Sequence, residues 1–144
     1  MKTWKYRTTN TFFDYLDFHD CLVEKIIVEK DKVIIEFRFI YVSAEHPLNP
    51  NDVAKSTDKC RLTFYGVTDS AAVIHLDEGM EKQVLITDLE EMEFLKFTQK
   101  PLGNLMIFDM FGTEWKTHQF SSIQITAISF TLEWNDFTEN AWYV

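Results

Sequence analysis

Residues 12–43 read FFDYLDFHDCLVEKIIVEKDKVIIEFRFIYVS, and the later half of this segment alternates in polarity. Apolar side chains occupy every odd position from 33 to 41, with Glu36 and Arg38 between them: Val33, Ile35, Phe37, Phe39 and Tyr41. A period of two residues is typical of a strand with one buried face. Residues 22–28 are rich in β-branched side chains, which favours a second strand. The segment therefore predicts a β-hairpin.

A turn at Lys30 and Asp31 gives this hairpin a consistent antiparallel register. The cross-strand pairs are then Val28–Val33 and Ile26–Ile35 on the buried face, and Lys25–Glu36 and Glu29–Lys32 on the other. Each such pair contributes about 0.2–1 kcal/mol. Glu24 is the exception, because it falls opposite Phe37 on the buried face. Either the strand ends there or the carboxylate reaches water at a sheet edge.

The rest of the chain supplies more short strands between turn-forming residues. Strands are expected near residues 2–9, 59–67, 72–76, 83–87, 105–111, 115–120 and 123–134, with turns at Gly112–Thr113 and Ser121–Ser122. Residues 44–58 contain two prolines and predict a surface loop. A short helix is expected to begin at Asn10 or Thr11, and residues 87–95 fit either a helix with a capping box or a strand.

This pattern predicts an all-β fold in a single domain covering residues 1–144. We expect an antiparallel sandwich or barrel of about eight or nine short strands, with at most one or two short helices. A parallel sheet is excluded because it would need long crossover helices. Ile128, Phe130, Leu132 and Trp134 are expected to share one face of the last long strand, opposite Ala127, Ser129, Thr131 and Glu133.

The net charge of −9 is concentrated in the second half of the chain. Residues 1–72 carry 10 basic and 11 acidic side chains, whereas residues 73–144 carry 4 and 12. Such a balance disfavours nucleic acid as a partner. The acidic segment combines one lysine, Lys82, with seven carboxylates that are the candidate partner-binding residues: Asp77, Glu78, Glu81, Asp88, Glu90, Glu91 and Glu93.

Two interpretations of this acidic segment remain open. Its charges can form a solvated face or protect edge strands against association between sheets. Alternatively, the carboxylates form a docking surface for a basic protein partner, because clustered charge accelerates encounter with an oppositely charged protein. Exposed aromatic residues such as Trp115, Trp142 or Tyr143 would then supply the buried anchors of the interface.

Candidate catalytic and metal-binding residues are few. His19, Asp20 and Cys21 are adjacent, so on an extended chain they point to alternating sides and are expected to be structural. Cys21 and Cys60 are expected to be buried free thiols. His75 and Asp77 would share a strand face, but the four histidines lack metal-site spacing. We predict no catalytic residue, no metal and no cofactor, since the nucleophile-elbow and phosphate-loop motifs are absent from the sequence.

The N-terminal residues MKTWKYRTTN lack the apolar segment of a secretory signal, and the sequence has no apolar run long enough for a membrane span. A cytoplasmic protein that does not bind membranes is expected, and a homo-oligomer is possible. The alternative to a protein-binding module is a small-ligand-binding β-barrel or enzyme whose pocket is lined by the many phenylalanines.

The residues Phe18, His19, Asp20 and Cys21, followed at once by an apolar hairpin in a small acidic chain, resemble uncharacterised bacterial all-β families. Some of these families are similar to immunity proteins of contact-dependent toxin systems. The resemblance implies a non-enzymatic protein that binds and neutralises a toxin domain, often a basic nuclease. It implies no role for any individual residue.

Overall fold

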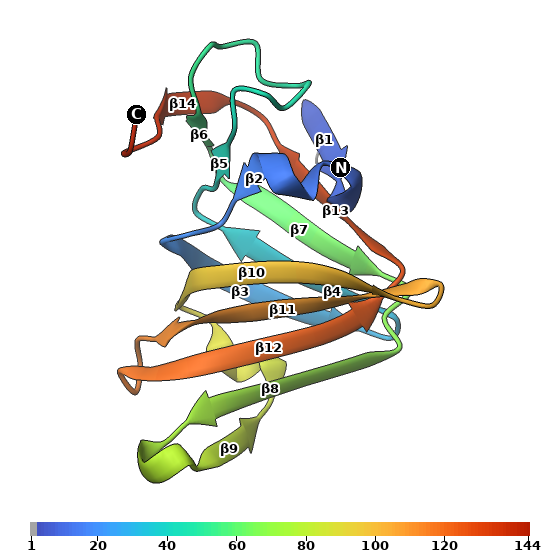
Figure 1. Ribbon diagram of the computed structural model, residues 1–144, viewed down its shortest axis with the longest axis vertical. Coiled ribbons are helices and arrows are strands. Elements are labelled where there is room, and N and C mark those ends of the chain that lie inside the picture. The colour runs from blue at the N-terminus through green and yellow to red at the C-terminus, as the bar shows by residue number, and fades with distance from the viewer. Residues whose placement is uncertain (1–2) are drawn as a thin grey trace.

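The computed structural model describes residues 3–144, so Lys2 of the predicted N-terminal strand lies outside the described range. In this range the chain is built from antiparallel strands (Figure 1), which confirms the all-β prediction. Ten strands form one sheet in the order β1 (Tyr6–Thr9), β13 (Ser129–Trp134), β7 (Cys60–Tyr65), β4 (Lys32–Phe37), β3 (Cys21–Glu29), β10 (Met92–Leu102), β11 (Leu105–Glu114), β12 (Gln119–Ala127), β8 (Asp69–His75) and β9 (Glu81–Val84).

A second, smaller sheet follows the order β14 (Phe137–Asn140), β6 (Lys55–Thr57), β5 (Tyr41–Val42) and β2 (Leu16–Asp17). Residues 3–144 thus contain fourteen strands, and the expected count of eight or nine was too low. The strands of the second sheet are two to four residues long. Such short pairings between loop segments leave no periodicity in the sequence, which explains the difference.

Three short 3₁₀ helices lie within residues 3–144, one more than the sequence predicted: η1 (Asn10–Tyr15), η2 (Asp77–Gly79) and η3 (Ile86–Leu89). The first begins where a helix was expected. The third resolves the ambiguity of residues 87–95, because η3 ends at Leu89 and β10 begins at Met92 after the turn formed by Glu90 and Glu91. Both interpretations of that segment were therefore partly right.

The long sheet has two halves that face each other across the core. β3 and β10 join the halves through only two residue pairs, Leu22–Glu93 and Cys21–Phe94. In Figure 1, β10, β11 and β12 lie in front of β3 and β4. Phenylalanine rings connect the halves: the centroids of Phe64 on β7 and Phe108 on β11 lie 5.0 Å apart. Because these rings fill the space between the halves, the core is continuous through the molecule.

The β3–β4 hairpin has the predicted turn and the predicted cross-strand pairs. The conflict at Glu24 is resolved by a register shift between Val23 and Lys25, so that Val23 pairs with Phe37 and Glu24 is left over. Such a β-bulge turns one extra residue out of the ladder. The Glu24 carboxylate lies 3.2 Å from Lys59 Nζ and 3.6 Å from Arg38 Nε. A charged residue can therefore stand within a buried strand pattern without entering the core.

The turns predicted at Gly112–Thr113 and Ser121–Ser122 were wrong, because β11 and β12 run through both and the turn lies at residues 115–118. Gly112 instead allows the backbones of β10 and β11 to approach each other closely. A β-carbon on Gly112 would lie 1.9 Å from the Glu93 carbonyl oxygen on β10. The close contact accompanies a register shift between Phe94 and Lys96. A glycine within a strand can mark such an approach as readily as a turn.

The expected strand at residues 123–134 is divided at Ile128, where the chain leaves β12 in one half of the sheet and enters β13 in the other. The buried apolar residues are odd-numbered through Ala127 and even-numbered from Phe130. Ile128 was expected to share a face with Phe130, Leu132 and Trp134, but these three are buried whereas Ile128 is 58% exposed. One residue outside the alternation is required because both strands must direct their apolar side chains into the same core.

Residues 44–58, predicted as a surface loop, contain four buried polar side chains: His46 and Asn49 in the loop itself, and Ser56 and Thr57 on β6. The Asn49 amide donates hydrogen bonds to the carbonyl oxygens of Val42 and Val53, both at 3.1 Å. His46 Nδ1 accepts from the Leu48 N–H at 3.0 Å, so Nε2 carries the proton and donates to Thr8 Oγ1 at 2.8 Å. These bonds fasten the loop to the core, and the loop ends at β6.

Candidate functional site

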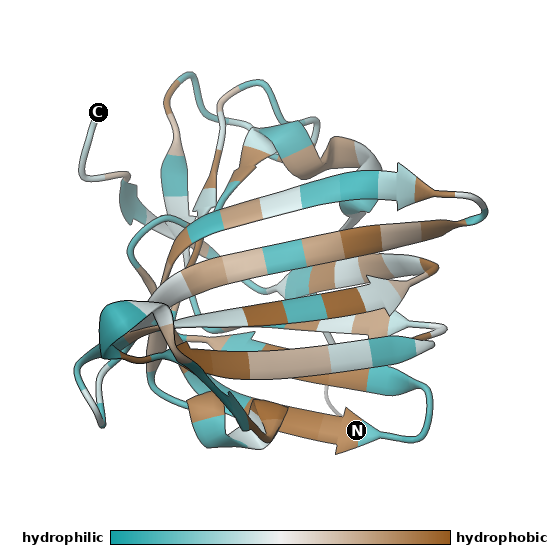
Figure 2. Cartoon of the chain, turned by 60° about the horizontal axis from the view of Figure 1, so that its bottom comes forward, coloured by the Kyte–Doolittle hydropathy of each residue, from teal (hydrophilic) through white to brown (hydrophobic). Residues whose placement is uncertain are grey.

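The outer face of β10, β11, β12, β8 and β9 carries a hollow of about 570 Å³. These strands alternate between core-facing apolar residues and outward-facing residues, as the hydropathy colouring in Figure 2 indicates. One residue from each strand forms a row across this face: Glu93, Thr113, Phe120, His75 and Glu81. Phe120 on β12 and His75 on β8 lie opposite each other, one position along the strands from the Ser121–Ile74 pair.

A second row lies beside the first, made of Lys96, Phe111, Ser122, Val73 and Gln83. The rings of Phe111 and Phe120 stack across β11 and β12, with their centroids 5.2 Å apart and their planes at 28°. Phe120 is 53% exposed. Near the start of β12, the stacked rings of Phe111 and Phe120 therefore form an apolar patch on the outer face of the sheet.

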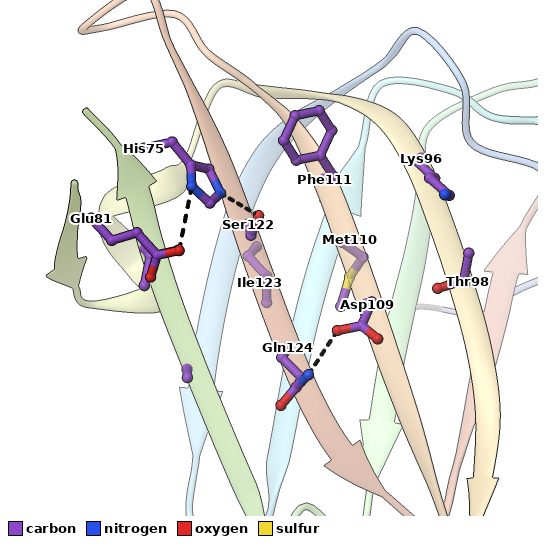
Figure 3. A pocket seen from close by; sticks show the side chains of 12 residues that line it. His75, Glu81, Lys96, Thr98, Asp109, Met110, Phe111, Ser122, Ile123 and Gln124 are labelled. Carbon is purple, nitrogen blue, oxygen red and sulfur yellow. Dashed lines mark hydrogen bonds and ion pairs between the residues drawn. The ribbon is translucent and has the colours of Figure 1, made fainter. Parts of the chain in front are cut away.

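Polar side chains lie around the Phe111 ring (Figure 3). His75 Nε2 and Ser122 Oγ are 2.7 Å apart, and His75 Nδ1 lies 3.7 Å from the Glu81 carboxylate. Gln124 Nε2 donates to Asp109 Oδ1 at 2.9 Å. The His75 ring also lies near Phe111, with 6.0 Å between the ring centroids. The histidine is thereby held between a hydroxyl, a carboxylate and an aromatic ring.

Ser122, His75 and Glu81 are the residue types of an acyl-transfer relay, but Ser122 is poorly placed for that chemistry. It lies within β12, between Phe111 on β11 and Val73 on β8. In a central strand the backbone N–H groups bond to the neighbouring strands, whereas acyl transfer needs N–H groups free to stabilise an oxyanion. The arrangement is better suited to binding a ligand or partner than to nucleophilic attack.

The structure brings only part of the acidic segment to this face. Glu81 and Glu93 stand at opposite ends of the first row, and Asp109 faces outward nearby. Trp115 Nε1 donates to the Glu93 carboxylate at 3.3 Å, so an exposed aromatic residue flanks that end. We call Glu81, Glu93, Asp109, Phe111 and Phe120 the acidic aromatic face.

The other predicted carboxylates are placed elsewhere. Asp88 accepts from the Leu85 N–H at 3.0 Å, and Glu90 accepts from the Ile26 N–H at 2.8 Å, so both satisfy backbone donors. Asp77 and Glu78 lie on η2, at the turn between β8 and β9. Glu91 is exposed between η3 and β10, with a φ of 73°. Two carboxylates of the acidic segment thus support the backbone, and Asp77, Glu78 and Glu91 are exposed to solvent.

The remaining predicted aromatic anchors, Trp142 and Tyr143, are exposed but belong to the other end of the molecule. Tyr143 packs against Tyr41 of the small sheet, with 5.7 Å between the ring centroids. Figure 1 shows β14 and β9 at opposite ends of the view. Of the three exposed aromatic residues named from the sequence, only Trp115 adjoins the acidic aromatic face.

His19, Asp20 and Cys21 occupy the entrance to β3. His19 Nδ1 lies 3.0 Å from the Asp20 carboxylate, and Asp20 adopts a φ of 64°. Cys21 is fully buried, and its Sγ lies 3.6 Å from the His19 carbonyl oxygen. Burial raises the pKa of the Cys21 thiol, so the reactive thiolate is disfavoured. Both cysteines are buried and free, which confirms the prediction for Cys21 and Cys60.

No group of three or more His, Cys, Asp or Glu side chains within the described range is arranged to hold a metal ion. His75, which the sequence paired with Asp77, pairs instead with Glu81 across the β8–β9 hairpin. None of the helices described for residues 3–144 has the length and apolar character needed to cross a membrane.

Sequence reasoning missed Phe111, Phe120 and Asp109 as surface residues. The available signal was the alternation of β11, in which the buried Phe108 and Met110 are each followed by a partly exposed residue, Asp109 and Phe111. The turn that was wrongly predicted at Gly112 interrupted this alternation, so the outward-facing residues of β11 were not recognised. Comparisons with protein-family models, curated proteins and solved structures gave no match.

Proposed function

We propose that this chain is a non-enzymatic protein-binding module that docks a basic partner through the acidic aromatic face. One observation carries the proposal, namely the different charge arrangement on the two outer faces of the long sheet. Across β3, β4, β7, β13 and β1, one row alternates in sign: Lys25, Glu36, Arg61, Glu133 and Arg7. The opposite face has no such alternation.

On the acidic aromatic face, the row between Glu81 and Glu93 contains Thr113, Phe120 and His75 but no lysine or arginine. Lys96 stands in the second row. Within this row Glu93 faces no cation and Glu81 faces only the His75 imidazole, which is 3.7 Å away and charged only when protonated, whereas Glu36 and Glu133 of the other face each lie between two basic residues. A partner with clustered positive charge would complete the pairing, and the exposed Phe120 would be buried by it.

The narrower form of the proposal is an immunity-like role, in which the partner is a basic toxin domain. The sequence Phe18-His19-Asp20-Cys21 and its hairpin support this form through their resemblance to such families. The acidity of the second half of the chain agrees with it.

The small-ligand alternative requires a pocket lined by the phenylalanines. Phe64, Phe108 and Phe130 instead pack on one another, with ring centroids 5.0–5.8 Å apart. All three are fully buried. The rings thus fill the interior between the two halves of the sheet, which favours the protein-binding module.

Binding of a captured basic partner to wild-type protein and to Glu81→Lys/Glu93→Lys tests the proposal. We expect the variant to associate at least about tenfold more slowly at low salt, with a smaller difference at high salt. Asp136→Lys/Glu139→Lys, which reverses two exposed charges near the small sheet, is the control for net charge. Equal association rates for both variants would disprove the proposed interface.

A further inference from the structure

We infer that the acidic aromatic face takes an arginine side chain of the partner, in preference to lysine. This inference rests on the proposed function and specifies the chemistry of the partner. The guanidinium group would pack on the stacked Phe111–Phe120 pair and bond to the Glu81 or Glu93 carboxylate.

The same molecule already uses this combination on its opposite outer face. Arg61 donates to Glu36 through Nε at 3.0 Å and Nη2 at 2.7 Å. The Arg61 guanidinium also lies over the Trp4 ring, 5.8 Å from its centroid. A carboxylate, a guanidinium and an aromatic ring therefore form one unit on a sheet surface, and only two of these three groups are present on the acidic aromatic face.

The spacing of the strands shows where the guanidinium group of the partner would lie. Phe120 lies two strands from Glu93 on one side and two strands from Glu81 on the other. Neighbouring strands are about 4.8 Å apart, so each carboxylate-bearing residue is about 10 Å from Phe120 along the row. A glutamate and an arginine, both extended, together span this distance. The aromatic pair thus forms the floor of the site, with an acid on either side.

The physical difference between arginine and lysine decides the preference. A guanidinium is planar and weakly hydrated, so it can stack on a ring and donate two parallel hydrogen bonds to a carboxylate at once. The lysine ammonium is a compact, strongly hydrated charge that gains less from an aromatic surface. The carboxylates alone would attract both side chains, whereas the exposed ring of Phe120 distinguishes between them.

The experiment uses a short glycine–serine peptide carrying two arginines, and the same peptide with lysines, each titrated into the purified protein at low salt. Binding is followed by NMR chemical-shift changes at Phe120 and Ser122. We expect the arginine peptide to bind at least about fivefold more tightly. Phe120→Leu should reduce this ratio to near one, because it keeps an apolar side chain but removes the ring.

Glu81→Gln/Glu93→Gln should weaken both peptides, and Asp136→Asn/Glu139→Gln provides a control with the same change in net charge. Equal affinities for the two peptides, an unchanged ratio in Phe120→Leu, or failure of the arginine peptide to shift these signals would each overturn the inference. If both peptides bind equally and both depend on Glu81 and Glu93, the arginine preference is wrong while the basic-partner proposal stands. Binding that is indifferent to Glu81 and Glu93 would refute both.

Discussion

The Glu90 carboxylate accepts a hydrogen bond from the backbone N–H of Ile26 at 2.8 Å, joining two parts of the chain that are 64 residues apart. β10 pairs with β3 only at Cys21 and Leu22, so the N–H of Ile26 lies beyond the reach of that ladder. The carboxylate takes the place of a missing strand partner. One residue of the acidic segment is thereby part of the connection between the two halves of the sheet.

Replacing Glu90 by alanine should therefore destabilise the fold. Loss of the acceptor leaves a partly buried N–H unsatisfied, which costs about 1–3 kcal/mol. The free energy of unfolding in urea measures the effect, with Glu78→Ala at an exposed turn position as the control. If both variants lose equally little, Glu90 belongs with the exposed charges and should be added to the candidate interface.

Gly112→Ala should be among the more damaging substitutions in the chain. A β-carbon there would lie 1.9 Å from the Glu93 carbonyl oxygen, and the contacting group is backbone that cannot rotate away. We expect a loss of about 3 kcal/mol, at the upper end of what overpacking costs. Thr113→Ala, at the next position along β11, should change stability by less than about 1 kcal/mol. Similar unfolding midpoints for the two variants would contradict the proposed close approach.

The hairpin around Val28 and Val33 could be predicted because its evidence is local. Its alternation, its turn and its cross-strand pairs all lie within one short segment. The crossing at Ile128 could not, because its change of alternation depends on which half of the sheet each strand joins. Gly112 misled for the same reason: its neighbour is the Glu93 carbonyl, 19 positions away in sequence.

The candidate site was predictable only in part for a related reason. Charge alone selected Glu81 and Glu93, but also Asp88 and Glu90, which satisfy backbone N–H groups. Sequence spacing does not distinguish these roles. Phe120 could be recognised as part of the site only from the strand register, which places it between Glu81 and Glu93.

Cys21 and Cys60 should resist thiol reagents while the protein is folded. Both side chains are fully buried, and burial raises the pKa of both thiols. At pH 8, reaction with a disulfide reagent should be slow in buffer and complete in denaturant. Cys60→Ser, which leaves one thiol, assigns any residual reaction. Rapid modification of Cys21 in the native protein would show that the entrance to β3 opens readily.

His46 should make the fold less stable as the pH falls. Burial lowers the pKa of His46 below its ordinary value of 6.5, so the unfolded chain binds a proton more readily than the folded one. The stability that depends on neutral His46 is therefore complete above pH 6.5 and is lost as the pH falls through the folded-state pKa. Protonation would also break the bond that Nδ1 accepts from Leu48.

Urea unfolding of wild-type protein and His46→Gln between pH 5 and pH 7.5 measures this dependence. We expect the variant to be less stable at pH 7.5 by about 1–3 kcal/mol, because it loses the buried hydrogen bonds of the ring. The difference should shrink toward pH 5, since only the wild-type protein pays the cost of a buried proton. Identical pH dependence in the two proteins would show that His46 does not titrate in this range. His19→Gln, at an exposed position, is the matched control and should leave the pH dependence due to His46 unchanged.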